Sequence, residues 1–264
     1  MTIRTTSNPL IRAAGRWLER ANDRHPWNHN DHFHPWILRS LPAAPARVLD
    51  VGCGRGELVA ALAGRAGIVE GIDPDAAMAY ATATRFQSDP RVRIARRTLT
   101  EQVADPTRAG QYDAVTMVAS LHHMDMSTAL TEARALLRPG GRLLIVTLTR
   151  PRTPADHAWD VLSALLNPLI GLAKHPRPVR PMDRLAGAAD RSRRPMDRPA
   201  GARDRPRQPT DPEAPAAATP PLRDPQLTID ELREVAAELL PGARIRRRQG
   251  FRVTLSWRKP LPRL

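Results

Sequence analysis

The stretch RVLDVGCGRGELVAAL, residues 47–62, decides the fold of this chain. An apolar run rich in valine and leucine leads into a glycine-rich turn, and the turn leads into a run of alanine and leucine with helical spacing. A strand, a tight turn and a helix in this order open a βαβ unit. The stretch therefore predicts a parallel α/β fold, and the residues of its turn indicate the class of ligand.

The same alternation of short apolar runs and helical patterns continues to residue 148 and indicates a parallel sheet. Near the end of the chain, Thr228 and Glu231 form a capping box at the start of a helix, and RIRRRQGFRVTLSWRKP predicts two strands around Gly250. We therefore expect an α/β, Rossmann-like, doubly wound sheet of seven mostly parallel strands with an antiparallel C-terminal hairpin. The first five strands are expected at 47–51, 68–72, 92–95, 112–118 and 142–148, and the helices between them at 56–64, 75–85 and 127–137.

The glycine turn lacks the features that hold phosphate. Its glycines are Gly52, Gly54 and Gly56, and Glu57 stands where a dinucleotide fingerprint requires its third glycine. A carboxylate in the first turn of the helix repels phosphate, and the lysine of a P-loop is missing from the turn. The ligand is therefore expected to carry no phosphate.

Two acidic residues indicate which ligand fits instead. Asp50 ends the first strand, and Asp73 ends the second strand within GIDPD, where a carboxylate can accept hydrogen bonds from both hydroxyls of a ribose. The N-terminus of the following helix can meet a carboxylate of the ligand. A ligand with an ammonium group, a carboxylate and a ribose but no phosphate is S-adenosylmethionine.

Four motifs carry a resemblance to a known family. VLDVGCGRGEL, GIDPD, YDAVTMVASLHHM and LLRPGGRLLIV resemble, in order and spacing, the successive motifs of class I S-adenosylmethionine-dependent methyltransferases. HPWNHNDHFHPWILRSLP and VTLSWRKP extend the resemblance to bacterial small-molecule methyltransferases related to quinone-methylating enzymes. The resemblance implies S-adenosylmethionine as cofactor and the strand order 3-2-1-4-5-7-6, with strand 7 antiparallel.

The resemblance also implies which residues hold the cofactor. Many relatives carry an aspartate after the third strand for the adenine amino group, but Arg97 and Thr98 stand at that point here, and Thr98 is left to accept one hydrogen bond. The expected contacts are Asp50, Gly52, Cys53 and Gly54 with the methionine part, Asp73 with the ribose, Pro74 and Asp75 beside the adenosine, and Ala119, Ser120 and Leu121 under the cofactor near its methyl group.

Histidines and an N-terminal segment are the candidates for the acceptor side. His122 and His123 follow the fourth strand, where one can act as general base or both can be loop residues that pack on the cofactor. Residues 1–46 are expected to form an N-terminal helical cap, in which Trp27, Asn28, His29 and Asn30 either contact the ligand or pack on the sheet. No metal site is expected at His29, His32 and His34. Cys53 is read as a small buried residue rather than a reactive thiol.

The rest of the chain divides by composition. Residues 47–173 are expected to form the cofactor-binding core, with a helix at 156–172 that Pro168 breaks and that serves either as a lid or as a membrane-surface contact. Residues 174–224 hold 11 prolines and a tandem repeat, RPMDRLAGAADRSR followed by RPMDRPAGARDRPR, and are expected to be a disordered insertion. Residues 225–264 supply the last helix and two strands.

Composition limits the location and the partners. The net charge of +14 favours anionic partners, although arginine and proline are enriched throughout. A single cysteine excludes an intramolecular disulfide, and no signal peptide or stretch of about 18 apolar residues is found, so a cytoplasmic protein without stable membrane insertion is expected. The oligomeric state is left open.

Three functions are compatible with these features, and the first is preferred. It is methyl transfer to a small-molecule acceptor. The second is RNA methylation, which the charge and RIRRRQGFR favour, whereas the lack of aromatic interleaving in the basic stretches argues against a nucleic acid. The third is a non-catalytic relative that binds the cofactor or a partner, against which the intact Asp50, Gly52, Gly54 and Asp73 argue.

Overall fold

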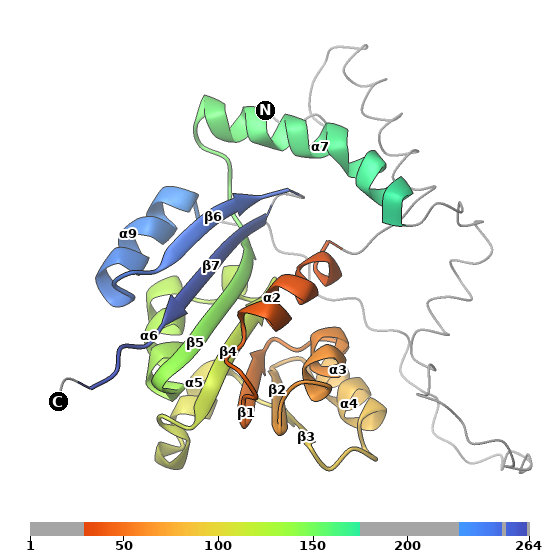
Figure 1. Ribbon diagram of the computed structural model, residues 1–264, viewed down its shortest axis with the longest axis vertical. Coiled ribbons are helices and arrows are strands. Elements are labelled where there is room, and N and C mark those ends of the chain that lie inside the picture. Colours follow the sequence, from red (N-terminus) through yellow and green to blue (C-terminus); the bar gives the residue numbers. More distant parts are fainter. Residues whose placement is uncertain (1–28, 175–226, 250–251, 263–264) are drawn as a thin grey trace, which may run out of the picture.

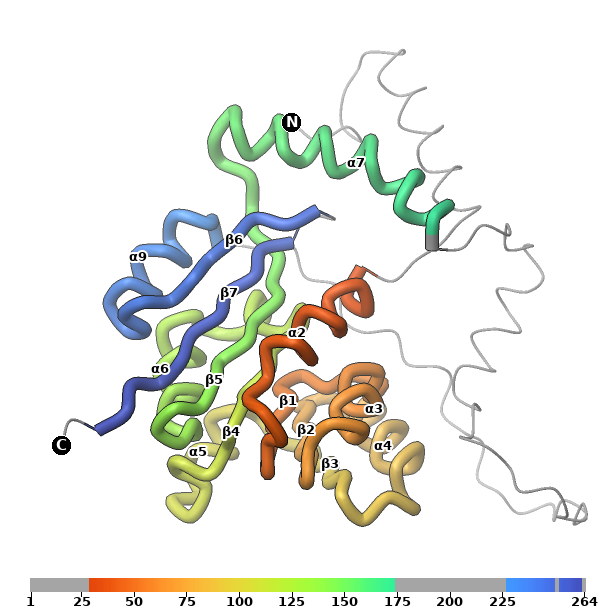
Figure 2. The backbone as a smooth tube through the Cα atoms, viewed as in Figure 1, coloured from red at the N-terminus to blue at the C-terminus, as the bar shows by residue number. Residues whose placement is uncertain are grey.

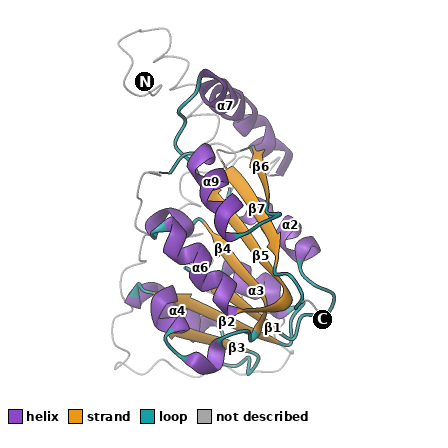
Figure 3. Ribbon diagram, turned by 90° about the vertical axis from the view of Figure 1, so that its left-hand side faces the viewer, coloured by secondary structure: helices purple, strands orange, loops and turns teal. Residues whose placement is uncertain are grey.

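The computed structural model describes residues 29–174, 227–249 and 252–262. Trp27, Asn28 and Gly250 lie outside these residues, as does the insertion expected at 174–224 apart from Lys174 itself. The described residues form a layered α/β structure, in which helices pack on both faces of one sheet and a long helix lies beyond one end of it (Figure 3).

The sheet has seven strands in the order β3-β2-β1-β4-β5-β7-β6 (Figure 1). Neighbouring strands from β3 to β5 pair parallel, whereas β7 pairs antiparallel with both β5 and β6. The expected strand order and the antiparallel C-terminal hairpin are therefore confirmed. The strands are β1 (Arg47–Val51), β2 (Ile68–Asp73), β3 (Val92–Arg96), β4 (Tyr112–Val118), β5 (Leu137–Leu148), β6 (Arg244–Arg248) and β7 (Arg252–Arg258).

Two apolar clusters hold the helices against the sheet. One cluster packs α2 (His34–Ser40) and α3 (Glu57–Ala63) against the strands, with Ile37, Val59 and Leu62 fully buried. The other packs α5 (Leu99–Val103), α6 (Met126–Leu136) and α9 (Ile229–Leu239). The remaining elements are α4 (Ala76–Arg85), which packs beside β2 and β3, α7 (Pro154–Lys174), and the short 3₁₀ segments η1 (Asp31–Phe33), η2 (Pro106–Arg108) and η3 (Leu121–His123).

Local capping residues set where the helices begin. The carboxylates of Asp75 and Asp125 accept hydrogen bonds from the third backbone N–H of α4 and α6. Thr228 and Glu231 form the expected capping box at α9, and Thr98 forms a second one with Glu101 at α5. Each box satisfies two backbone N–H groups that no helical carbonyl can reach.

Two sequence-based boundaries were wrong. β5 begins at Leu137 rather than Arg142, because RPGG continues the strand through an irregularity opposite Tyr112. Pro168 does not break the helix expected at 156–172, since α7 is one helix of 21 residues with the proline inside it. A proline removes one backbone hydrogen bond, and the turns on either side carry the helix past it.

The long helix α7 leaves the end of β5 and crosses beyond β6 and β7 (Figure 2). Its exposed side is apolar and carries Val161, Leu162, Leu165, Leu169 and Leu172, whereas Asp156, Ser163 and Asn167 on its other side are buried. None of the described helices is long and apolar enough to cross a membrane.

Candidate cofactor and acceptor site

A cavity of about 820 Å³ opens at the carboxyl ends of β1, β2 and β4. In a doubly wound sheet, ligands bind at this edge. Of the residues expected from the sequence, the lining contains Asn30, Asp50, Gly52, Cys53, Gly54, Asp73, Pro74, Asp75, Thr98, Ala119, Ser120, His122 and His123. Leu121 is fully buried in the core beside it, and His29 bonds to α7.

The glycine turn wraps closely around the end of β2. The backbone N–H groups of Gly52 and Cys53 both donate to the carbonyl of Ile72, at 2.8 and 3.0 Å. Gly52 has a φ of 73°, and a Cβ added to it would stand 2.5 Å from Cβ of Ser120. Only glycine therefore fits at this position, where the backbone forms the wall of the cavity.

Asp73 is held with its carboxylate at the cavity wall. Its Oδ2 accepts from the backbone N–H of Gly54 at 2.9 Å, and its Oδ1 accepts from the backbone N–H of Asp75 at 2.9 Å. These two bonds fix the orientation of the carboxylate. The glycine turn is secured a second time by Thr82, whose hydroxyl donates to the carbonyl of Gly54 at 2.5 Å.

Asp50 lies deeper and is almost fully buried. Thr116 Oγ1 donates to its Oδ1 at 2.8 Å. Burial raises the pKa of Asp50 to about 7, against the effect of the Thr116 hydrogen bond, and the negative charge of Asp73 adds to the rise. Two carboxylates in one cavity favour a cationic ligand group and oppose phosphate, which agrees with the sequence.

Cys53 and Ala119 complete the floor of the cavity. The Cys53 side chain is buried, and burial raises the pKa of its thiol far above neutrality, so the group stays protonated. Ala119 has a φ of 54°, which is rare for a residue with a Cβ. Ser120 Oγ donates to the carbonyl of Val51 at 2.7 Å and ties this strained turn to β1.

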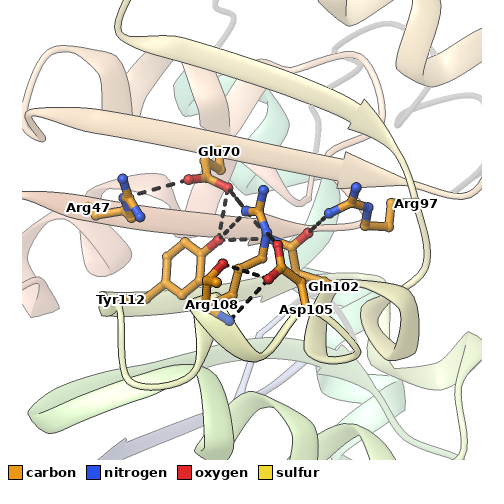
Figure 4. Close-up of polar contacts among 8 residues, drawn as sticks. Arg47, Glu70, Arg97, Gln102, Asp105, Arg108 and Tyr112 are labelled. Carbon is orange, nitrogen blue, oxygen red and sulfur yellow. Dashed lines mark hydrogen bonds and ion pairs between the residues drawn. The ribbon is translucent and has the colours of Figure 1, made fainter.

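A largely buried polar cluster joins β2 and β4 to the segment after β3 (Figure 4). Glu70 accepts hydrogen bonds from Arg108 at 2.5 Å and from the Tyr112 hydroxyl at 2.8 Å. Gln102 donates to the Tyr112 hydroxyl at 2.7 Å and accepts from Arg97 at 3.0 Å. Arg97 lines the cavity, so the cluster connects the core of the sheet to the cavity wall.

Thr98 lines the same wall, and its hydroxyl is used in the capping box. It donates to Glu101 Oε2 at 3.0 Å and accepts from the Glu101 backbone N–H at 3.2 Å. The hydrogen bond that the sequence assigns to Thr98 as an acceptor therefore competes with a helix cap.

Two histidines stand at the mouth of the cavity. The rings of His122 and His123 lie with their centroids 4.1 Å apart. His122 Nδ1 is buried and has no hydrogen-bond partner among the described residues. Burial lowers the pKa of His122 to about 4, and the charges of His123 and Arg252 contribute, so the imidazole is neutral at pH 7.

Arg252, the first residue of β7, also lines the cavity and was not anticipated from the sequence. It donates to Asn30 Oδ1 at 3.0 Å, and burial lowers its pKa to about 10. Nothing in the sequence distinguishes Arg252 from the other arginines of this stretch. It lies at the cavity because the antiparallel pairing with β5 places the start of β7 at this edge of the sheet.

No metal cluster is found in this part of the molecule. Across residues 29–174, 227–249 and 252–262, no group of three histidine, cysteine, aspartate or glutamate side chains is placed to hold a metal ion.

The cavity fits S-adenosylmethionine. The Gly52 backbone leaves space that a Cβ would fill, two carboxylates line the same cavity, and no phosphate-binding group is present in the turn. Fold and cavity together define a Rossmann-like methyltransferase. The comparisons with known proteins agree with this class.

The chain belongs to the class I S-adenosylmethionine-dependent methyltransferases. The family described as "Methyltransferase domain" matches residues 49–143. An uncharacterized methyltransferase of Mycobacterium tuberculosis (strain ATCC 25618 / H37Rv) is 32% identical over 237 residues, which cover 89% of this chain and 98% of the relative. The ubiquinone biosynthesis O-methyltransferase of Marinobacter nauticus is 32% identical over 154 residues, or 57% of this chain and 64% of that protein.

Solved structures share the fold. The CurJ carbon methyltransferase superposes with a TM-score of 0.51 at 13% identity and covers 88% of this chain and 54% of that one. A possible exported protein from Bordetella parapertussis superposes with a TM-score of 0.51 at 18% identity and covers 96% of this chain and 70% of that one. The family model and the sequence relatives, rather than these structures, show that the protein is an S-adenosylmethionine-dependent methyltransferase. The third function considered from the sequence, a non-catalytic relative, is therefore set aside.

Proposed function

We propose that this methyltransferase modifies a small-molecule acceptor that enters the cavity beside the cofactor. The observation that carries the proposal is His122 Nδ1, a buried ring nitrogen without a hydrogen-bond partner among the described residues, in the wall of the cavity that also contains Asp50 and Asp73. A buried polar atom costs free energy unless a partner satisfies it. An acceptor hydroxyl or amine at this point supplies that partner.

The cofactor residues take the roles that their positions support. Asp50, Gly52, Cys53 and Gly54 hold the methionine part, with Asp50 facing the ammonium group. Asp73 receives the ribose hydroxyls, with Pro74, Asp75 and Thr98 around the adenosine, and Ala119 and Ser120 lie under the reacting end of the cofactor.

Methyl transfer requires alignment more than acid-base chemistry. The bound cofactor supplies a methyl group activated on a sulfonium. His122 is neutral at pH 7, so it can accept a hydrogen bond from an acceptor O–H or N–H and orient it. Its low pKa favours such a positioning role over complete proton removal, and His123 packs against it to fix the ring.

The N-terminal segment and α7 form a cap and a lid over this side. His29 Nε2 and Asn167 Oδ1 lie 2.9 Å apart and connect the segment to α7. Asn30 accepts from Arg252 and connects it to β7. These contacts support a cap formed by the described part of this segment, residues 29–46, because Asn30 lines the cavity, and they support α7 as a lid only through its bond to the neighbouring His29.

Relatives support a hydroxylated, apolar acceptor. The Marinobacter nauticus protein, which aligns over 57% of this chain, is named for O-methylation in ubiquinone biosynthesis. The other lining residues near His122 include Met124, Leu148 and Val118, which suit the apolar body of such a molecule.

The test is methyl transfer from S-adenosylmethionine with a labelled methyl group to fractions of a bacterial extract. Label in an organic-soluble fraction of low molecular mass, lost in Asp73→Ala, is the expected result. Label that appears only in RNA or only in protein would overturn the small-molecule assignment. Calorimetric titration with S-adenosylhomocysteine confirms in parallel that the protein used binds the cofactor product.

A further inference from the structure

A second groove is lined by residues of α2, β5, β6 and β7. Figure 1 shows where these four elements lie in the fold. The volume of the groove is about 650 Å³, and it shares no lining residue with the cofactor cavity. Five arginines from the three strands line it: Arg142, Arg244, Arg246, Arg248 and Arg258. Nothing in the methyl-transfer reaction uses these residues.

Strand alternation gathers the arginines on one face. Residues 244, 246 and 248 of β6 point to the same side, whereas Arg247 points to the other side and pairs with the buried carboxylate of Asp156. None of the five groove arginines forms an ion pair with a described residue, and the groove lining contains no aspartate or glutamate. The charge of the groove is thus left for a ligand to neutralise.

The sheet register makes the charge more concentrated. Arg142 of β5 stands directly opposite Arg258 of β7. Like charges at directly opposed positions destabilise a sheet. An anion bound between them would offset this repulsion.

The spacing of the arginines points to a linear polyanion. Alternate residues of a strand are about 6.8 Å apart, so β6 presents Arg244, Arg246 and Arg248 as an evenly spaced row. Trp36 of α2 lines the opposite wall and is half-buried, which leaves part of its ring for a base to stack on. A recessed groove accepts a single strand, whereas a membrane is a broad surface that would contact its rims.

We propose that this groove binds single-stranded nucleic acid, with the arginines of β5, β6 and β7 on its phosphates and Trp36 against a base. The site is separate from the methyl-transfer cavity. It therefore makes the nucleic acid a binding partner, and its existence does not depend on which acceptor is methylated.

The test is fluorescence anisotropy of a labelled oligouridylate of about 12 nucleotides with the full-length protein at about 50 and 200 mM salt. The groove variant is Arg244→Gln with Arg246→Gln. The matched control is Arg65→Gln with Arg93→Gln, which removes the same charge from exposed positions away from the groove. Titration with S-adenosylhomocysteine shows that each variant is folded.

The proposal predicts that oligouridylate binding weakens at higher salt. The affinity should fall about tenfold or more in the groove variant, with a salt slope shallower by about 2, and should be unchanged in the control. Equal weakening in both variants would trace binding to overall charge and overturn it. Absence of oligouridylate binding would also overturn it, as would binding only to vesicles of anionic phospholipid or only to inorganic triphosphate.

Discussion

The carboxylate of Asp73 and the backbone N–H of Gly54 are joined by a hydrogen bond of 2.9 Å. It connects the end of β2 to the turn that follows β1. The residue proposed to bind the ribose therefore also holds in place the turn proposed to bind the methionine part. A change at Asp73 therefore acts on both halves of the cofactor site.

Asp73→Ala is expected to weaken binding of S-adenosylhomocysteine by at least about tenfold, since each hydrogen bond to a charged group contributes about 1.5 to 3 kcal/mol. Calorimetric titration measures the change. Asp89→Ala is the matched control, because Asp89 pairs with Arg91 away from the cavity. Unchanged affinity in Asp73→Ala, or an equal loss in the control, would refute the role of Asp73.

Asp50 predicts a pH dependence of cofactor binding. Its pKa of about 7 means that the carboxyl group is largely protonated at pH 5 to 6. An ammonium group favours the ionised form, so binding releases a proton and the affinity for S-adenosylmethionine should rise between about pH 5 and pH 7.

Titrations in two buffers of different ionisation enthalpy report the proton release directly. Asp50→Asn keeps the shape of the side chain beside Thr116 and removes the titration, so it should flatten the pH dependence. If the dependence persists in Asp50→Asn, another group is responsible.

Gly52 is expected to be required for steric reasons, because the turn has no room for a Cβ at this position. Gly52→Ala combines a positive φ with a Cβ 2.5 Å from Ser120, so the glycine turn must move. We expect the cofactor affinity to fall. We also expect a loss of folding stability larger than the roughly 1 to 2 kcal/mol that an alanine in the left-handed conformation costs by itself.

The control is Gly110→Ala, where φ is 67° and an added Cβ meets nothing within 4 Å. This variant carries the backbone cost alone. Urea unfolding and calorimetry on both variants separate the two effects, and equal results for the two would show that the contact with Ser120 is unimportant.

The strand order, the glycine turn and most of the cofactor contacts could be predicted, because they depend on neighbours in the sequence. Asp50 and Asp73 end adjacent parallel strands, so their meeting at one edge follows from the fold class. The capping box at Thr228 was readable for the same reason, since its two partners are three residues apart.

Features that depend on pairing over long distances could not be predicted. Arg252 lines the cavity, and Trp36 lines the same groove as the arginines of β6, only after the antiparallel strands have joined the sheet. Trp36 is distant in the sequence from the basic stretch RIRRRQGFR, so the sequence-based prediction did not connect the two. Pro168 misled for another reason: the local rule against proline in helices was outweighed by the rest of α7.

Glu70 predicts a large effect on stability. It is 6% exposed, and its carboxylate accepts hydrogen bonds from the Arg108 guanidinium and from the Tyr112 hydroxyl. Glu70→Gln removes the carboxylate that pairs with Arg108 and Arg47, whereas Arg108 keeps its ion pair with Asp105. The expected cost is therefore about 1.5 to 3 kcal/mol, as for a hydrogen bond to a charged group. Tyr112→Phe removes one hydrogen bond and should cost about 1 to 2 kcal/mol.

Asp230→Asn serves as the control, because the exposed pair of Asp230 and Arg233 should contribute less than about 1 kcal/mol. Urea unfolding at pH 7 gives all three values. A Glu70→Gln loss as small as that of the control would mean that the cluster of Figure 4 does not stabilise the sheet.

His122 predicts how stability depends on pH. Its pKa falls from 6.5 to about 4 in the folded protein. The unfolded state therefore binds more protons between these values, so the contribution of a neutral His122 to the free energy of unfolding is complete above pH 6.5 and is lost as the pH falls toward 4.

His122→Gln removes this contribution. The difference in the free energy of unfolding between wild type and variant should therefore shrink as the pH falls from about 7 to about 4.5, just above the lower of the two pKa values. His157→Gln, at an exposed histidine of α7 outside the cavity, is the matched control. Because Asp50 titrates in the opposite direction in all of these proteins, only the difference between them isolates the histidine. A constant difference for His122→Gln would mean that the His122 ring is solvated in solution, and its place as the positioning group for the acceptor would then be lost.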